Sequence, residues 1–402
     1  MLEAPQRAPG RLDGSPTVII GDRRRPGLPG ELVARVALIW VGVALLQTLG
    51  LVLDLSLSHA SAPPPLLAAM SQLAASGCTM LLLGRLAYRF FDVETAGLAC
   101  LVSALALPLM AVLRPGEINP LAWQAVALLL TLNGLMAREP RSGGWAIGAA
   151  LALWLAISAQ GTVLALGILA LAAGKWLENR GQRGWLVHAM QALTAASGAL
   201  WVGQWALGVI PGCDALGLPE LAALAWATGI VMLVGAVEPH PRAFTLGGFA
   251  VAIGGAVAIV ANLAPACPSG AALGLAAARP LWLETPVFAV QAIGLPLVAL
   301  ATVAHLHGRA CQWLRRWWAD YFLILLLATI LAVVDGRAAP AACALAAVPL
   351  GWQIREWTRA ARNSRRHGRR AFALAGVALA CAPALPLALV MTATPSVASA
   401  IH

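Results

Sequence analysis

Apolar runs of about 17 to 25 residues follow one another along almost the whole chain, and short turns containing proline, glycine and charged residues separate them. A helix of this length is long enough to cross the hydrocarbon core of a bilayer. Inside lipid every backbone group must bond within its own segment, so such runs form helices and not open strands. The pattern therefore predicts an all-α protein, a polytopic bundle of transmembrane helices.

The pattern predicts about thirteen spans, within a range of about 12 to 14. They cover residues 32–53, 66–84, 95–113, 121–137, 145–158, 161–177, 185–210, 221–237, 244–263, 287–306, 321–334, 341–353 and 371–392. The count has a range because runs as short as 145–158 and 341–353 can be tilted, re-entrant or extended by flanking residues.

The segments outside these spans are short. Residues 1–30 are rich in proline, glycine and arginine and lack apolar periodicity, which predicts a disordered basic tail. A transmembrane helical domain over residues 31–393 follows, and residues 394–402 form a short tail on the outer side.

Composition agrees with this pattern and excludes an ordinary soluble domain. Hydrophobic residues make up 60% of the chain and charged residues 11%, and the mean hydropathy is +0.79. Soluble domains have about twice this charged fraction. The net charge of +10 suggests a nucleic-acid partner only until the basic residues are located.

The basic residues are distributed unevenly between the two sides of the predicted bundle. With about thirteen spans and a cytoplasmic N-terminus, the outer loops contain only Arg114, Arg279 and Arg337 of the 27 basic residues. Cytoplasmic loops carry such an excess of lysine and arginine. We therefore expect a cytoplasmic N-terminus and no nucleic-acid partner. The densest group, Arg355 to Arg370, is interpreted as an anchor against anionic lipid head groups, with RNA binding or a protein dock as alternatives.

The three outer arginines depart from this charge bias and call for a local explanation. An anionic partner such as a lipid phosphate is one, because a guanidinium binds it bidentately. The alternative is that each arginine pairs with a nearby carboxylate. These pairs would be Arg114 with Glu117, Arg279 with Glu284, and Arg337 with Asp335.

Two further pairs of residues on the outer side could carry chemistry. Asp54 and Glu117 stand at ends of spans, where carboxylates can bind a divalent cation or act as a general base. The alternative is that both are simply solvated. Cys213 and Cys267 are the cysteines in predicted outer loops, so they are the candidates for a disulfide if their positions allow it.

Several segments resemble a known superfamily of membrane enzymes. Residues 84–91, 106–109 and 114–119 are similar to the early transmembrane region of GT-C glycosyltransferases. The likeness is greatest to a bacterial group of uncharacterised members related to the catalytic subunits of oligosaccharyltransferases. Residues 267–270 and 280–284 are similar to a later outer loop of that group.

This resemblance implies a glycosyltransferase of the bacterial inner membrane that takes a sugar from a polyprenyl-phosphate donor at the outer face. Asp54 would be the base or a metal ligand, and a divalent cation, Mg or Mn, would be the cofactor. Arg279 and Arg337, with Arg114, would hold the lipid phosphate. Glu284 would orient the acceptor or the metal.

The chain also departs from the family in the loop around residues 117–121. Asn119 stands where the family has a carboxylate, Pro120 and Leu121 stand where it has two histidines, and Glu117 stands where it has an arginine. The first outer loop, 54–65, is short. A second hypothesis is therefore a non-catalytic protein that binds lipid or a partner on the same scaffold. A third is a small-molecule transporter, against which we count a lack of buried charge and of inverted repeats.

Overall fold

The computed structural model describes residues 29–58, 66–115, 119–137, 139–158, 161–208, 216–237, 241–263, 278–381, 383–384 and 387. Within these ranges the chain forms α-helices joined by short turns and no strands, which confirms the predicted all-α class. The α-helices are α1 (Gly30–Ser58), α2 (Leu66–Phe90), α3 (Val93–Leu105), α4 (Leu107–Val112), α5 (Pro120–Leu135), α6 (Pro140–Ile157), α7 (Thr162–Glu178), α8 (Arg183–Ala206), α9 (Leu218–Ala236), α10 (Arg242–Leu263), α11 (Pro286–Arg309), α12 (Gln312–Val334), α13 (Ala339–Asn363) and α14 (His367–Cys381). Short 3-10 turns are η2 (Arg180–Gln182), η4 (Leu281–Leu283) and η5 (Gly336–Ala338).

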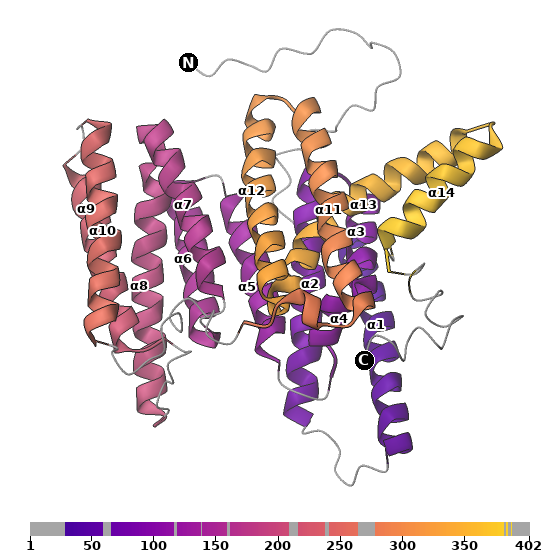
Figure 1. The fold of residues 1–402 in the computed structure, drawn as a ribbon, viewed down its shortest axis with the longest axis horizontal. Coiled ribbons are helices and arrows are strands. Elements are labelled where there is room, and N and C mark those ends of the chain that lie inside the picture. The colour runs from indigo at the N-terminus through magenta and orange to yellow at the C-terminus, as the bar shows by residue number, and fades with distance from the viewer. Residues whose placement is uncertain are drawn as a thin grey trace.

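Most of the helices stand side by side, with α9 and α10 at one end of the molecule's long axis and α14 at the other (Figure 1). Among the described residues, five helices are long and apolar enough to cross a membrane, in α1, α9, α10, α11 and α12. This is the architecture of a helical membrane protein. The number of spans and their orientation stay predictions.

The predicted span 95–113 is not one helix, because it breaks between α3 and α4. Pro108 lies in the first turn of α4, and the backbone at Ala106 is extended. The buried Gln291 of α11 satisfies the groups that the break exposes. Its Nε2 donates to the Leu105 carbonyl at 2.9 Å, and its Oε1 accepts from the Leu107 N–H at 3.2 Å. A break at membrane depth is tolerated when its backbone groups find partners in this way.

The helix α13 lies at the centre of the bundle because its first turns consist of small residues. Gly351 faces α3 so closely that a Cβ atom there would lie 2.7 Å from the Ala99 nitrogen. Small residues allow such backbone approach between membrane helices. Pro349 of α13 has no N–H to give to the Leu345 carbonyl one turn earlier, and the Tyr321 hydroxyl of α12 donates to that carbonyl instead.

The helices α6 and α8 also pack with their backbones close together. A Cβ atom on Gly148 of α6 would lie 2.2 Å from the Ala189 carbonyl oxygen of α8. This contact fixes α6, whose second half carries Trp154.

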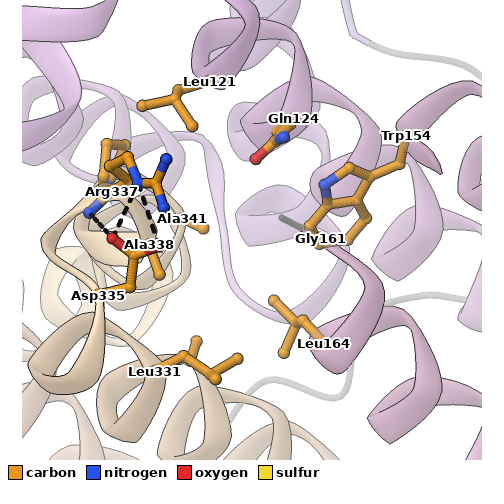
Figure 2. Close-up of a pocket in the computed structure, with 12 residues that line it drawn as sticks. Leu121, Gln124, Trp154, Gly161, Leu164, Leu331, Asp335, Arg337, Ala338 and Ala341 are labelled. Carbon is orange, nitrogen blue, oxygen red and sulfur yellow. Dashed lines mark hydrogen bonds and ion pairs between the residues drawn. The ribbon is translucent and has the colours of Figure 1, made fainter. Parts of the chain in front are cut away.

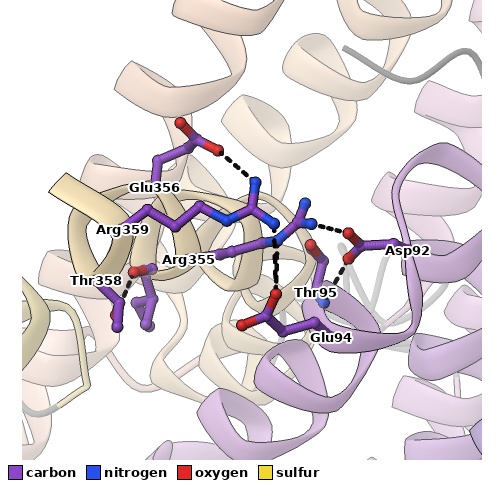
Figure 3. Close-up of polar contacts among 8 residues, drawn as sticks. Asp92, Glu94, Thr95, Arg355, Glu356, Thr358 and Arg359 are labelled. Carbon is purple, nitrogen blue, oxygen red and sulfur yellow. Dashed lines mark hydrogen bonds and ion pairs between the residues drawn. The ribbon is translucent and has the colours of Figure 1, made fainter. Parts of the chain in front are cut away.

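At the far end of α13 a charged cluster joins it to α3 (Figure 3). Asp92 caps α3 by accepting from the Thr95 N–H at 2.9 Å, and it forms an ion pair with Arg355. Glu94 accepts from Arg355 Nε at 3.0 Å and lies 3.5 Å from Arg359. Two arginines of the predicted lipid anchor are therefore paired within the fold. The other members of the group, Arg362, Arg365, Arg366, Arg369 and Arg370, are exposed, and for these the lipid anchor stays a prediction.

Candidate functional site

The strongest polar cluster on the predicted outer side lies where α12 ends and α13 begins. Asp335 ends α12, and its Oδ1 accepts from the Arg337 backbone N–H at 3.2 Å and from Arg337 Nε at 3.0 Å. The Asp335 side chain is buried, and that of Arg337 is 25% exposed. The predicted pairing of Arg337 with Asp335 is thus confirmed.

Backbone hydrogen bonds hold the segment that carries Arg279 and Glu284 against this turn. The Gly336 N–H donates to the Arg279 carbonyl at 2.7 Å, and the Arg279 N–H donates to Asp335 Oδ1 at 3.3 Å. A Cβ atom on Gly336 would lie 3.4 Å from Glu284 Cγ. Arg337, which is far from both in the sequence, therefore shares one place in the fold with Arg279 and Glu284.

The side chains of Arg279 and Glu284 are both exposed. They form no ion pair with each other in the described part of the structure. The predicted pairing of Arg279 with Glu284 is therefore wrong, because their backbones are held by other groups and their side chains extend into the surroundings. This leaves an exposed cation and an exposed carboxylate next to the half-buried Arg337.

The loop before α5, in which the chain departs from the family, has a structural role here. The Asn119 side chain accepts from the Leu121 N–H at 3.0 Å, and Pro120 is the first residue of α5. Asparagine is among the best residues for capping a helix N-terminus, and proline suits the first helical position. Arg114 is exposed shortly after α4.

The remaining predicted site residues cannot be compared with the structure. Asp54 belongs to α1, but its side chain lies outside the described residues, as do Glu117, Cys213 and Cys267. The metal pair and the disulfide stay predictions. Within the described ranges, no group of three or more histidine, cysteine, aspartate or glutamate side chains could hold a metal ion.

A small cavity lies beside Arg337 and involves residues that the sequence did not single out. Its volume is about 30 Å³, and α5, α6, α7, α12 and α13 contribute to its wall. The lining includes Gln124 of α5, Trp154 of α6 and Arg337 of η5 (Figure 2). Gln124 Nε2, Trp154 Nε1 and Arg337 Nη2 are all buried without a hydrogen-bond partner among the described residues. The one signal in the sequence was a lone amide at position 124 inside an apolar run.

Gly161 positions the Trp154 indole at this cavity. A Cβ atom on Gly161 would lie 1.9 Å from Trp154 Nε1, so only glycine leaves room for the ring in its present place. Gly161 therefore contacts the edge of the indole ring that carries Nε1.

Together the fold and this cluster define an all-α helical membrane protein with a polar cluster at the turn between α12 and α13. Two solved structures of an archaeal oligosaccharyltransferase from Archaeoglobus fulgidus are similar to it. One, tethered with an acceptor peptide containing the NVT sequon, has a TM-score of 0.52 and 17% sequence identity, and the match covers 78% of this chain and 42% of that chain. The other, AglB in complex with an inhibitory peptide and a dolichol-phosphate, has a TM-score of 0.54 and 14% identity, and the match covers 79% and 43%.

This likeness shows that the chain shares its helical fold with that oligosaccharyltransferase. At such low identity it shows the fold alone. The matched region spans about two-fifths of the length of those chains. No family model and no curated protein matches the sequence.

Proposed function

We propose that this protein is a GT-C-like glycosyltransferase that takes a sugar from a polyprenyl-phosphate donor at the outer face of the membrane. One observation carries the proposal: Arg279, Glu284 and Arg337 are fastened together on a GT-C-like scaffold. The donor class follows from the charge of this cluster, since guanidinium groups are the preferred protein partners of phosphate.

The two arginines have different parts in the proposed reaction. The carboxylate of Asp335 orients Arg337 through Nε, so its other nitrogens keep their direction when the donor arrives. Arg279 is exposed and supplies a second positive charge. When the bond between the sugar C1 and the phosphate oxygen breaks, negative charge develops on that oxygen, and both cations stabilise it.

Glu284 is the exposed carboxylate of this cluster and has the role of general base. It would accept the proton of the acceptor group as that group forms its bond to the sugar C1. From their positions at the ends of spans, Asp54 and Glu117 are the predicted ligands of a divalent cation, Mg or Mn. The side chains of both lie outside the described residues, so the metal pair stays a prediction. The bacterial inner membrane is the proposed location.

The test uses the purified full chain in lipid nanodiscs and a radiolabelled polyprenyl-phosphate hexose. The assay measures sugar transfer and hydrolysis of the donor. We expect the Arg279→Gln, Arg337→Gln double variant to lose at least about tenfold in rate, because each charge-assisted bond to the phosphate is strong. Arg309→Gln is the matched control, since Arg309 is an exposed arginine at the end of α11, and its rate should equal that of the wild type.

Two outcomes would replace this proposal by one of the other hypotheses. Binding of the lipid without transfer or hydrolysis would favour a non-catalytic lipid-binding protein, which the capping role of Asn119 also favours. Absence of both binding and turnover would remove the lipid-phosphate donor altogether.

The transporter hypothesis regains some support from the partly buried ion pair of Lys175 and Asp320 between α7 and α12, because the sequence had indicated no buried charge.

A further inference from the structure

The tip where α13 ends and α14 begins carries positive charge that the fold does not neutralise. Figure 1 shows this tip projecting from the end of the molecule opposite to α9 and α10. Arg355 and Arg359, earlier on α13, pair with carboxylates of the fold. The tip arginines, in contrast, are exposed and form no ion pair with any residue that the structure describes: Arg362, Arg365, Arg366, Arg369 and Arg370. Because like charges this close in the chain repel one another, an anion from outside the fold would stabilise the tip.

An uncovered apolar surface of α14 begins directly after the tip arginines. One face of the helix is covered, since Ala373 and Ala380 are buried and a Cβ atom on Gly376 would lie 3.2 Å from the Trp357 ring of α13. The large side chains outside that face are apolar and exposed: Phe372 by 82%, Leu374 by 49% and Leu379 by 49%. Residues 371–381 include no charged residue. The protein therefore presents a group of cations and, next to it, an apolar surface that the fold leaves open.

This order of groups along α14 matches the order of groups in an anionic phospholipid. Guanidinium groups bind the headgroup phosphate through charge-assisted hydrogen bonds, and acyl chains cover apolar side chains. Basic clusters next to membrane helices bind anionic lipids in this way. A nucleic acid or an acidic protein segment would also neutralise the arginines, but it would leave the aliphatic side chains of Leu374 and Leu379 uncovered. The apolar surface therefore favours a lipid over these two other anions.

We propose that this tip is a binding site for an anionic phospholipid. The tip arginines hold the headgroup phosphate, and Phe372, Leu374 and Leu379 contact the acyl chains. The site narrows the predicted lipid anchor to the arginines that the fold leaves unpaired, and it adds a surface for the acyl chains. It lies at the opposite end of α13 from Arg337, and it does not depend on sugar transfer. The positive-inside bias assigns it to the cytoplasmic leaflet.

The test measures which lipids the purified full chain retains. The protein is equilibrated in detergent micelles with equal amounts of phosphatidylglycerol, which is anionic, and phosphatidylcholine, which has no net charge, and bound lipids are counted by native mass spectrometry. The tip variant combines Arg366→Gln, Arg369→Gln and Arg370→Gln. The matched control loses the same charge on the same predicted side, through glutamine at three exposed arginines around the turn between α11 and α12: Arg309, Arg315 and Arg316.

We expect the wild type and the control to prefer phosphatidylglycerol, and the tip variant to lose at least about tenfold of this preference, because each arginine near an anionic headgroup contributes to binding. Phe372→Ala should lower the retention of phosphatidylglycerol, whereas Leu207→Ala, which also replaces an apolar side chain that is 82% exposed, should not. All the replaced side chains are exposed, so the helix content measured by circular dichroism should equal that of the wild type in every variant.

Three outcomes would overturn the proposal. Equal losses in the tip variant and the control would mean that net charge alone attracts the lipid. Binding of glycerol phosphate, which has no acyl chains, as tightly as phosphatidylglycerol would remove the role of Phe372 and its apolar neighbours. Binding of single-stranded RNA that the tip variant loses, without a preference for phosphatidylglycerol in the wild type, would assign the tip arginines to a nucleic acid instead of a lipid.

Discussion

At the scale of single residues, Gly161 has the sharpest steric role, because the Trp154 indole occupies the space of its missing side chain. We predict that Gly161→Ala destabilises the protein by about 1–3 kcal/mol, the usual cost of overpacking. The free energy of unfolding in detergent measures this.

Gly174→Ala is the control, since Gly174 lies in α7, the helix that Gly161 directly precedes, and no atom lies within 4 Å of the position of its Cβ. There the substitution should leave the protein equally stable or stabilise it by about 0.5–1 kcal/mol, because alanine loses less backbone freedom in a helix. Equal effects of the two substitutions would show that Gly161 does not hold the indole in place.

At this scale, the sequence predicted one part of the candidate site and did not predict another. Asp335 and Arg337 are two residues apart, so their pairing followed from proximity along the chain. That Arg279 lies beside them depends on a backbone contact across 57 positions, between Arg279 and Gly336, which no local pattern reveals. Trp154 stayed unnoticed because an aromatic residue in an apolar run usually indicates packing.

At the scale of helices, the hydrophobic pattern predicted where helices lie but not how they are interrupted. The break between α3 and α4 falls at Ala106 and depends on Gln291, which lies far away in the sequence. A proline in an apolar run is compatible with a kink or with a break, and only the partner of the exposed backbone groups decides between them.

A second interruption, in α13, gives a prediction for a pair of helices. Pro349 leaves the Leu345 carbonyl without its helical partner, and Tyr321 of α12 supplies a replacement. We predict that Tyr321→Phe costs about 1–3 kcal/mol of unfolding free energy, because a buried acceptor loses its donor. In a Pro349→Ala background the alanine N–H can bond to Leu345, so the same change should cost much less.

The double-mutant cycle measures this difference directly by chemical denaturation of the four proteins. Additive effects would mean that the tyrosine hydroxyl and the proline act independently, and would contradict the proposed compensation between α12 and α13. Pro349→Ala alone is the internal control for any effect of straightening the helix.

At the scale of the whole molecule, the fold places two groups of arginines at opposite ends of α13: those of the candidate site and those of the predicted lipid anchor. This helix has 25 residues, and a helix of that length extends about 37 Å. Arg337 precedes its first residue, and the exposed Arg365 follows its last residue. The positive-inside bias therefore predicts that the Arg337 end, with the candidate site, faces outward and that the Arg365 end faces the cytoplasm.

Cysteine labelling in intact cells tests this orientation. In a background without the native cysteines, Trp282→Cys reports on the η4 turn beside the candidate site, where Trp282 is 70% exposed, and Arg365→Cys reports on the other end. A membrane-impermeant maleimide should label position 282 in intact cells and position 365 only after permeabilisation. The reverse pattern would place Arg279 and Arg337 in the cytoplasm, where a donor at the outer face cannot reach them, and would refute the proposed reaction while leaving the fold unchanged.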